Sequence, residues 1–381
     1  MNINKTIIII TGAAVLTALL FLPQILTGSK KNIIEQGFLS QVYKNTDNLK
    51  EAMWYEKLED GKIKCNLCPN ECILKPGQRG ICKVRENIDG KLYALNYAQA
   101  VSINVDPIEK KPIFHMLPGS TAFSIATAGC NLSCLNCQNW QISQSYPEDL
   151  DSFYLTPQQV VDKAIESGSK SIAYTYSEPI IFYEYMLETA KLAHDKDLKN
   201  IMVTAGYINP EPLAELLPYI DAFNVDLKGF SDEFYMRIVG GHLDPVLDSI
   251  KIVAESDKFL EITYLIIPGE NDSFEMISAM LDWVLENVGE NAIVHFSRFH
   301  PLYKLTNKPE TPLETLINAR DLALKKGLKY VYIGNVVYPQ AENTYCNDGS
   351  IAIERQGYFI KQNKLEKGKC ADDTEIPGVW E

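Results

Sequence analysis

The chain has 381 residues, of which 46% are hydrophobic and 22% charged, so it can bury one large core with appendages or two domains. Its formal net charge of −13 argues against nucleic acid as a partner, because phosphate binding requires a basic surface and no Lys/Arg stripe is visible. Small molecules or proteins are the expected partners. Seven of the nine cysteines fall in two tight groups, which is typical of metal ligation rather than of a disulfide framework.

Residues 7–26 are almost wholly apolar, and about 20 such residues cross a bilayer as a helix. We expect residues 1–31 to be an uncleaved single-pass membrane anchor; a cleaved signal peptide ending near Thr27-Gly28-Ser29 and a buried core helix are the alternatives. Lys30, Lys31 and Lys44 follow the apolar run, so the positive-inside rule places the large domain that follows in the cytoplasm.

Residues 32–117 are expected to hold a polar connector and a small N-terminal lobe rich in cysteine. Cys65, Cys68, Cys72 and Cys82 could close a four-coordinate site, with Gly and Pro residues supplying the turns between them. Both structural zinc and a second, fully ligated iron–sulfur cluster are compatible with four thiolates, and the sequence does not choose between them.

From Thr121 the sequence alternates short apolar runs with capped amphipathic helices, which indicates parallel βα units in a domain spanning 118–338. One helix is predicted to begin at Thr156-Pro157 and to end before Gly168, and another to begin with a capping box at Thr311–Glu314 and to end at Gly327. The fold class is therefore α/β, a TIM-like barrel, complete or partial. The predicted strands are Ala122–Ala126, Ser171–Tyr174, Asn200–Thr204, Ala222–Asp226, Leu260–Ile267, Ala292–Phe296 and Tyr330–Ile333.

Three cysteines, Cys130, Cys134 and Cys137, follow the first predicted strand in a CxxxCxxC pattern with no fourth cysteine close behind. Since an iron–sulfur cluster normally has four thiolate ligands, three would leave one iron of a [4Fe–4S] cluster open for chemistry. A zinc knuckle is the alternative, although zinc sites more often pair their cysteines as two CxxC units. The pattern resembles the signature of the radical S-adenosylmethionine (SAM) superfamily. That resemblance implies a [4Fe–4S] cluster whose open iron binds SAM and whose electron splits it into methionine and a 5′-deoxyadenosyl radical.

The later strand ends carry polar groups where a barrel places its chemistry. Ser177 and Glu178 lie in a TYSEP stretch that resembles the GGEP motif of radical SAM enzymes, and the Glu178 carboxylate could accept hydrogen bonds from the SAM ammonium. Thr204, in VTAG, resembles a position in the VTNG stretch of glycyl-radical-enzyme activating enzymes. Asn139, in the continuation CQNWQISQ of the cysteine loop, is a further expected SAM contact.

Two further residues are candidates for catalysis. Lys228 follows the fourth strand in an Asp226-Leu227-Lys228 pattern that matches the activating enzymes, and it is expected near SAM or substrate, although an Asp–Lys pair could be purely structural. His300 resembles the histidine that those enzymes place beside SAM, whereas His295 is expected to face the barrel core.

The ordered set CNLCPNEC, GQRGICKVREN, DPIEKKPIFHMLPGS, TYSEPIIFYEY, ENTYC and IPGVW resembles the radical SAM member of the AmmeMemoRadiSam system, a branch of the pyruvate formate-lyase activating-enzyme-like proteins. This likeness covers residues 53–381 and implies AMMECR1-like and Memo-like partner proteins. Relatives carry CxxC in each half of a small C-terminal zinc ribbon, whereas residues 339–381 keep only Cys346 and Cys370. We expect a degenerate, metal-free ribbon; oxygen ligation of a metal by Asp348, Asp372 or Asp373 and a Cys346–Cys370 disulfide are the alternatives, the disulfide being favoured outside the cytoplasm.

The expected function is that of a membrane-tethered radical SAM enzyme that abstracts hydrogen from a protein or small molecule, with an electron donor such as flavodoxin or ferredoxin. A glycyl-radical-enzyme activase is the closest alternative. A non-catalytic metal-binding scaffold is an alternative of another class, with both cysteine groups structural.

Overall fold

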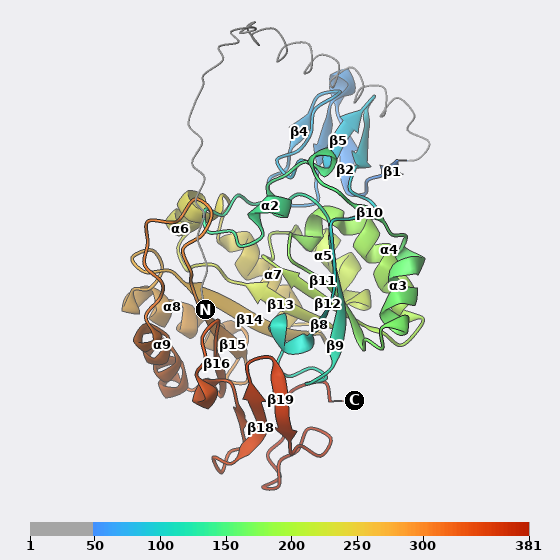
Figure 1. The fold of residues 1–381 in the computed structure, drawn as a ribbon. Helices are drawn as coiled ribbons and strands as arrows, with labels where there is room; N and C mark the ends of the chain where they lie inside the picture. Colours follow the sequence, from blue (N-terminus) through green and yellow to red (C-terminus); the bar gives the residue numbers. More distant parts are fainter. Residues whose placement is uncertain (1–48, 381) are drawn as a thin grey trace, which may run out of the picture. The chain divides into compact units, whose positions relative to one another are not determined.

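The computed structural model describes residues 49–380. Its centre is one eight-stranded sheet in the order β16-β15-β14-β13-β12-β11-β9-β8 (Figure 1). Seven strands run parallel, and β8 (Ser102–Pro107) pairs antiparallel with β9 at one edge. The parallel strands are β9 (Thr121–Ala126), β11 (Ser171–Tyr174), β12 (Lys199–Thr204), β13 (Ala222–Asp226), β14 (Phe259–Ile266), β15 (Ile293–Arg298) and β16 (Tyr330–Gly334).

These seven strands confirm the predicted ones to within two residues at each end. Because β8 and β16 are the two edges of the sheet and do not pair with each other, the barrel is partial. The parallel strands are mostly buried along their length, which explains why they read as short apolar runs.

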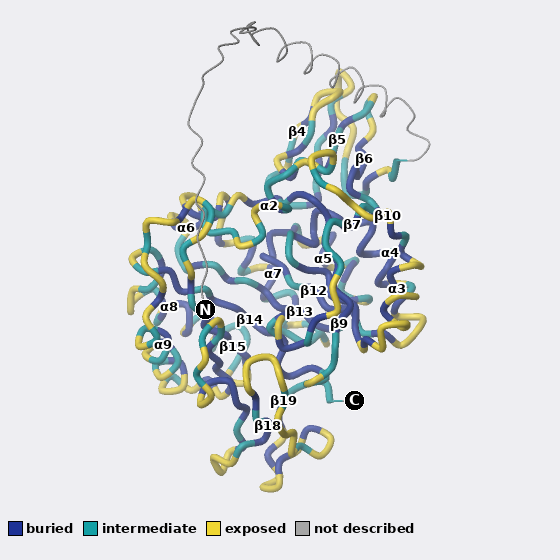
Figure 2. The backbone as a smooth tube through the Cα atoms, viewed as in Figure 1, coloured by how far each residue is buried: buried dark blue, intermediate teal, exposed yellow. Residues whose placement is uncertain are grey.

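Helices lie around the outside of this sheet, with buried inner faces and exposed outer faces (Figures 1 and 2). They are α3 (Pro157–Glu166), α4 (Tyr183–His194), α5 (Pro210–Leu216), α7 (Asp244–Ala254), α8 (Phe274–Asn287) and α9 (Leu313–Lys326). The predicted start of α3 is confirmed, since Thr156 and Gln159 form a capping box.

The predicted capping box of α9 is wrong, although the helix ends at Gly327 as expected. Pro312 is the N-cap and offers no side-chain hydrogen bond. The Thr311 hydroxyl is used elsewhere: it accepts a hydrogen bond from the Phe299 amide and donates one to the Ile266 carbonyl. Tertiary contacts of the barrel therefore recruit the residue that local sequence assigned to the helix.

The N-terminal lobe consists of small antiparallel sheets. One contains β1 (Lys50–Glu51), β6 (Lys91–Ala94) and β5 (Arg85–Ile88), another β2 (Tyr55–Lys57), β3 (Ile63–Cys65) and β4 (Ile73–Leu74), and β7 (Gln99–Ala100) pairs with β10 (Phe153–Tyr154). A buried ion pair between Arg85 and Glu184 of α4 joins the lobe to the barrel. The Met53 amide donates to the same carboxylate over 2.7 Å.

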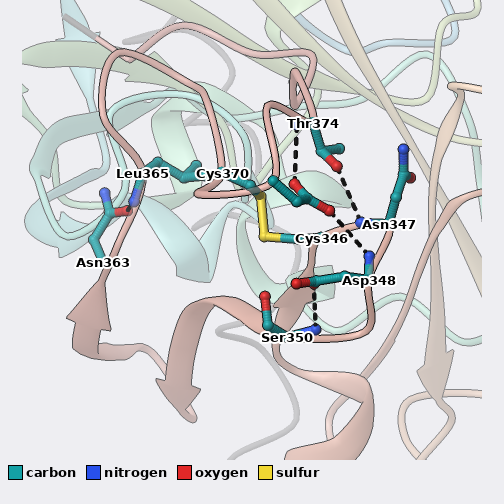
Figure 3. The surroundings of a disulfide bond; sticks show 9 residues. Cys346, Asn347, Asp348, Ser350, Asn363, Leu365, Cys370 and Thr374 are labelled. Carbon is teal, nitrogen blue, oxygen red and sulfur yellow. Dashed lines mark hydrogen bonds between the residues drawn. A yellow bond between two sulfur atoms is a disulfide. The ribbon is translucent and has the colours of Figure 1, made fainter.

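The C-terminal tail forms a three-stranded sheet of β17 (Thr344–Tyr345), β18 (Ile351–Gln356) and β19 (Phe359–Asn363). Cys346 and Cys370 are joined by a disulfide bond (Figure 3). The two nearby carboxylates accept hydrogen bonds: Asp348 from the Ser350 amide, and Asp372 from the amides of Asp348 and Thr374. Of the alternatives for these two cysteines, the structure thus contains the disulfide.

The predicted single-pass membrane localisation is not upheld. The longest helices between residues 49 and 380, α8 and α9, have 14 residues each. At a rise of 1.5 Å per residue they span about 21 Å, less than the roughly 30 Å of a bilayer core. None of the described helices is long and apolar enough to cross a membrane. The apolar segment 7–26 lies outside the described residues, and we withdraw the membrane localisation.

Candidate active site

A cavity of about 490 Å³ opens at the ends of the parallel strands, within the usual size of a ligand pocket. It collects side chains from the loops that follow β9, β11, β12 and β13, as a barrel of this kind predicts. Of the residues singled out in the sequence, it is lined by Cys130, Cys134, Cys137, Asn139, Ser177, Glu178, Thr204, Lys228 and His295.

The cysteine loop is held in place by a π-helical turn, Tyr235–Val239, that follows the short helix α6 (Asp232–Phe234). Such turns leave backbone carbonyls free of their usual partners and recur at functional sites. Here the Ile238 and Val239 carbonyls accept hydrogen bonds from the amides of Leu135 and Ser133, each over 2.9 Å. The loop that carries Cys134 is therefore fixed by backbone contacts.

The three sulfur atoms of this loop suit a metal cluster. Burial raises the pKa of the Cys134 thiol to about 11 and that of Cys130 well above its usual range, so the bare loop holds neutral thiols. Bound metal cations displace such protons, because they stabilise the thiolate. The nearby Lys228 ammonium favours the same anionic form at Cys134. Three thiol donors on the wall of one cavity fit a [4Fe–4S] cluster with one iron free of protein ligands.

Glu178 lies at the centre of the hydrogen bonds that join two strand ends. Its carboxylate accepts hydrogen bonds from Thr204 Oγ1 over 2.5 Å and from the Ala205 amide over 2.8 Å. Burial raises its pKa to about 7. Ser177 turns away from it and donates to the Thr127 carbonyl over 2.8 Å. Glu178 is thus a fixed acceptor with capacity for a cationic ligand group.

Asn139 closes the cysteine loop against the β11 end. It stands directly before the short helix α2 (Trp140–Ser143), and its Nδ2 donates to the Tyr176 carbonyl over 2.7 Å. The cysteine loop and the TYSEP stretch are thereby held together.

Lys228 pairs with Asp226 across 3.0 Å between Nζ and Oδ2. The Asp226 carboxylate and the Cys134 sulfur both raise the pKa of Lys228, against the opposing effect of burial. Asn271 also holds this strand end, donating to the Lys228 carbonyl over 2.8 Å. A permanent positive charge therefore faces the cavity beside the cysteine loop.

The two histidines of the sixth strand end lie in different surroundings. His300 does not line the cavity; its ring is exposed and its Nδ1 lies 2.9 Å from Glu310 Oε1. His295 is buried in the barrel, as expected, where its Nε2 contacts Glu261. The structure thus brings together every predicted SAM contact except His300.

Sequence reasoning assigned no role to three further residues of the cavity region. Lys111 Nζ donates to Asp106 Oδ2 over 2.6 Å, and the Tyr176 hydroxyl donates to the same carboxylate. Burial lowers the pKa of Lys111 to about 8. Both charged residues lie in the DPIEKKP stretch, so that motif was the available signal, but nothing in it indicated a contact with Tyr176.

The four N-terminal cysteines line a second, smaller cavity together with Arg85 and Asn131. Arg85 Nη1 lies 3.6 Å from Cys65 Sγ, so this site has a buried positive charge next to one of its sulfur atoms. All four predicted metal-ligating residues thus face one space.

A βα barrel with three cysteines on the loop after its first parallel strand defines a class, and comparison with known proteins agrees. The model of the radical SAM superfamily matches residues 124–284. An uncharacterized protein of Methanocaldococcus jannaschii is 47% identical over 319 residues, which cover 84% of this chain and 95% of that protein. The chain belongs to the radical SAM superfamily, whose members use a [4Fe–4S] cluster and SAM.

Two further proteins that the chain resembles over part of its length are activating enzymes. The 4-hydroxyphenylacetate decarboxylase activating enzyme of Clostridium scatologenes is 26% identical over 118 residues, which cover 30% of this chain and 38% of that enzyme. A crystallised domain of pyruvate-formate lyase-activating enzyme from Bacteroides vulgatus has 17% identity and a TM-score of 0.40, covering 44% of this chain and all of that domain.

Proposed function

We propose that this protein cleaves SAM reductively and uses the resulting radical to abstract hydrogen from a protein or small-molecule substrate. A [4Fe–4S] cluster on Cys130, Cys134 and Cys137 would supply the electron that splits SAM into methionine and a 5′-deoxyadenosyl radical. The observation that carries the proposal is the convergence of these cysteines with Glu178 and Lys228 on one cavity.

The other residues of the cavity have roles that follow from their contacts. Glu178 would bind the SAM ammonium, because its carboxylate is buried and already fixed by Thr204. Asn139, Ser177 and Thr204 would hold the loops around SAM, and Lys228 would balance negative charge beside Cys134. His300 receives no role in this proposal because it does not line the cavity; its Nδ1 pairs with Glu310 and its Nε2 lies 3.4 Å from the Asn335 carbonyl oxygen.

The test is formation of 5′-deoxyadenosine from SAM by anaerobically reconstituted protein reduced with dithionite. We expect product with the wild type and none with Cys134→Ala, while Asn287→Ala, whose side chain donates to the Trp283 carbonyl within α8, serves as a control. Equal product from wild type and Cys134→Ala would refute the proposal. It would favour a non-catalytic metal-binding scaffold, which should contain zinc and bind no SAM.

A glycyl-radical-enzyme activase is a second candidate, favoured by the similarity to 4-hydroxyphenylacetate decarboxylase activating enzyme. Such an enzyme would accept a glycine-bearing segment of a partner protein in the cavity. Electron paramagnetic resonance of a candidate partner after reaction decides, since only an activase leaves a stable glycyl radical there.

The resemblance of the ordered motifs extends the proposal to partners. We propose that the chain acts in an AmmeMemoRadiSam system with AMMECR1-like and Memo-like proteins, and that flavodoxin or ferredoxin supplies electrons. Co-purification of a labelled AMMECR1-like or Memo-like protein with the full chain would support this assignment if an excess of the same unlabelled protein abolishes it.

A further inference from the structure

The proposed function leaves the four cysteines of the N-terminal lobe without a role. They lie on different segments around one small cavity: Cys65 ends β3, Cys68 and Cys72 lie in the turn before β4, and Cys82 precedes β5. Gly80 completes the wall, because a Cβ there would lie 3.5 Å from Cys82 Sγ and 3.6 Å from Cys72 Sγ. The sulfur atoms therefore converge on a shaped space.

The distances between these sulfur atoms distinguish a single zinc ion from a metal cluster as the group that this site would bind. Four thiolates bound to Zn²⁺ at about 2.3 Å lie only about 3.8 Å from one another. Among the described residues, three ligand atoms come within 4.8 Å of one another only at Cys346, Cys370 and Asp372. In this structure no three of the N-terminal sulfur atoms are therefore as close together as the ligands of one zinc ion, and a cluster, whose metal atoms separate the thiolates, accommodates that spacing.

The cysteine loop of the active site behaves in the same way. Cys130, Cys134 and Cys137 also fail to bring three sulfur atoms within 4.8 Å. Members of the superfamily use a [4Fe–4S] cluster, and the proposed function assigns that cluster to this loop. The two cysteine groups of this chain thus share the wide spacing expected of clusters.

The two groups are in direct contact through Asn131, the residue after Cys130. Asn131 lines the N-terminal cavity together with Cys68, and its Nδ2 donates to the Tyr207 carbonyl over 2.8 Å. Asn70, between Cys68 and Cys72, donates from Nδ2 to the Asn131 carbonyl over 2.7 Å. Asn131 therefore follows a ligand of one group in the chain and is hydrogen-bonded to the turn that carries two ligands of the other.

The backbones of the two loops also pack against each other at Gly129. Its φ of +96° lies in the left-handed region, and a Cβ there would meet the Cys82 carbonyl oxygen at 2.5 Å. A close approach of this kind holds the two cysteine groups at a fixed separation.

We propose that Cys65, Cys68, Cys72 and Cys82 bind a second [4Fe–4S] cluster, and that electrons reach the active-site loop through it by way of Asn131. One electron leaves a low-potential flavin or iron–sulfur donor protein, reduces the N-terminal cluster, and then passes to the active-site cluster, so that the donor is oxidised by one electron and the active site reduced by one. This inference rests on the proposed function for the use of that electron.

A cluster on the N-terminal cysteines would give an electron-donor protein an access route that stays open while SAM and substrate occupy the active-site cavity. SAM and substrate must occupy the cavity over Cys130, Cys134 and Cys137, so they cover the active-site group on that side. Cys68 and Cys72 are partly exposed, whereas Cys65 and Cys82 are buried. A second cluster would thus be near the surface on one side and against Asn131 on the other. Arg85, whose charge is paired with Glu184, would donate a hydrogen bond to the Cys65 ligand through Nη1.

Metal content tests the identity of the second group independently of catalysis. For the full chain purified anaerobically we expect about eight iron and eight sulfide per chain and no zinc, falling to about half in Cys68→Ala/Cys72→Ala. After reduction, electron paramagnetic resonance should show two cluster signals, of which SAM shifts only one. About four iron with one zinc per chain would overturn the proposal, whatever the activity toward SAM.

The relay is tested by comparing two reductants. Cys68→Ala/Cys72→Ala should keep the SAM-shifted signal and dithionite-driven 5′-deoxyadenosine formation, but lose most of the reduction of that signal by reduced flavodoxin or ferredoxin. Unchanged reduction by the protein donor would overturn the relay. If the double variant misfolds, Asn70→Ala takes its place, because it retains all seven cysteine ligands and should slow reduction of the active-site cluster by the protein donor. Asn287→Ala on α8 should not slow this reduction. Failure of the wild type to cleave SAM with dithionite would instead refute the proposed function, and the metal content would still decide the second cluster.

Discussion

Thr204 donates a hydrogen bond from Oγ1 to Glu178 Oε1 over 2.5 Å, joining the ends of β12 and β11 at the mouth of the cavity. Glu178→Gln removes the negative charge and keeps an acceptor for Thr204. Since a hydrogen bond to a charged group contributes about 1.5–3 kcal/mol, we expect SAM to bind roughly ten- to a hundredfold more weakly. Calorimetric titration of reconstituted protein with SAM measures this change. Glu188→Gln is the matched control. Glu188 lies in α4 and contacts Lys50 and Tyr97 instead, so this variant should bind SAM as the wild type does.

Gly129→Ala should disturb both cysteine groups. Its new methyl group would meet the Cys82 carbonyl oxygen at 2.5 Å and Val84 Cγ1 at 2.6 Å. Gly168 also has a positive φ, of +69°, but has no atom within 4 Å of an added Cβ. Gly168→Ala should therefore cost only the backbone strain of about 1–2 kcal/mol. Iron content and melting temperature are measured for both variants, and Gly129→Ala should lower both quantities more than Gly168→Ala does. Equal decreases in the two variants would contradict the close packing at Gly129.

Reduction of the Cys346–Cys370 disulfide should loosen the C-terminal tail. The bond closes a loop with a sequence separation of 24 residues, and the chain-entropy model assigns such a loop a stabilisation of about 3–4 kcal/mol. We expect Cys346→Ser/Cys370→Ser to lower the melting temperature, with the earliest loss of hydrogen-exchange protection in β17–β19. Unaltered protection there would show that the strands hold without the bond.

His115 should make stability depend on pH. The ring is fully buried, with Nε2 2.6 Å from the Tyr332 hydroxyl, and Glu261, His295 and Arg355 are its charged or titratable neighbours. Burial lowers its pKa from 6.5 to about 4. Because the unfolded chain binds the proton first as pH falls, stability present above pH 6.5 is lost between about 6.5 and 4, by up to about 3 kcal/mol.

Urea unfolding of wild type and His115→Gln at pH 7.5 and pH 5 measures this effect. The variant should lose less stability than the wild type between the two pH values. His194→Gln, on the outer end of α4, should retain the full difference. A wild type equally stable at both pH values would show that neighbouring charges compensate for the buried ring.

Much of the barrel could be predicted from the sequence, because local patterns determine it. Strands buried on both faces read as apolar runs, and the Thr156–Gln159 capping box is a contact between near neighbours. The cysteine spacing and the TYSEP stretch likewise indicated Cys130, Cys134, Cys137 and Glu178 as residues of one site, since parallel strands end at the same edge of a sheet.

Contacts between distant segments were decided by the tertiary structure alone. The Thr311 hydroxyl donates to the Ile266 carbonyl and does not cap α9. His300 pairs with Glu310 and does not line the cavity. The sulfur spacing at Cys65, Cys68, Cys72 and Cys82, and the contact of Asn131 with that group, also depend on the packing of one loop against another. Sequence determined which ligands and strands exist, because those follow from residue type and short-range periodicity. Distances between residues remote in the chain are set by the packed core, and they alone brought the two cysteine groups into contact.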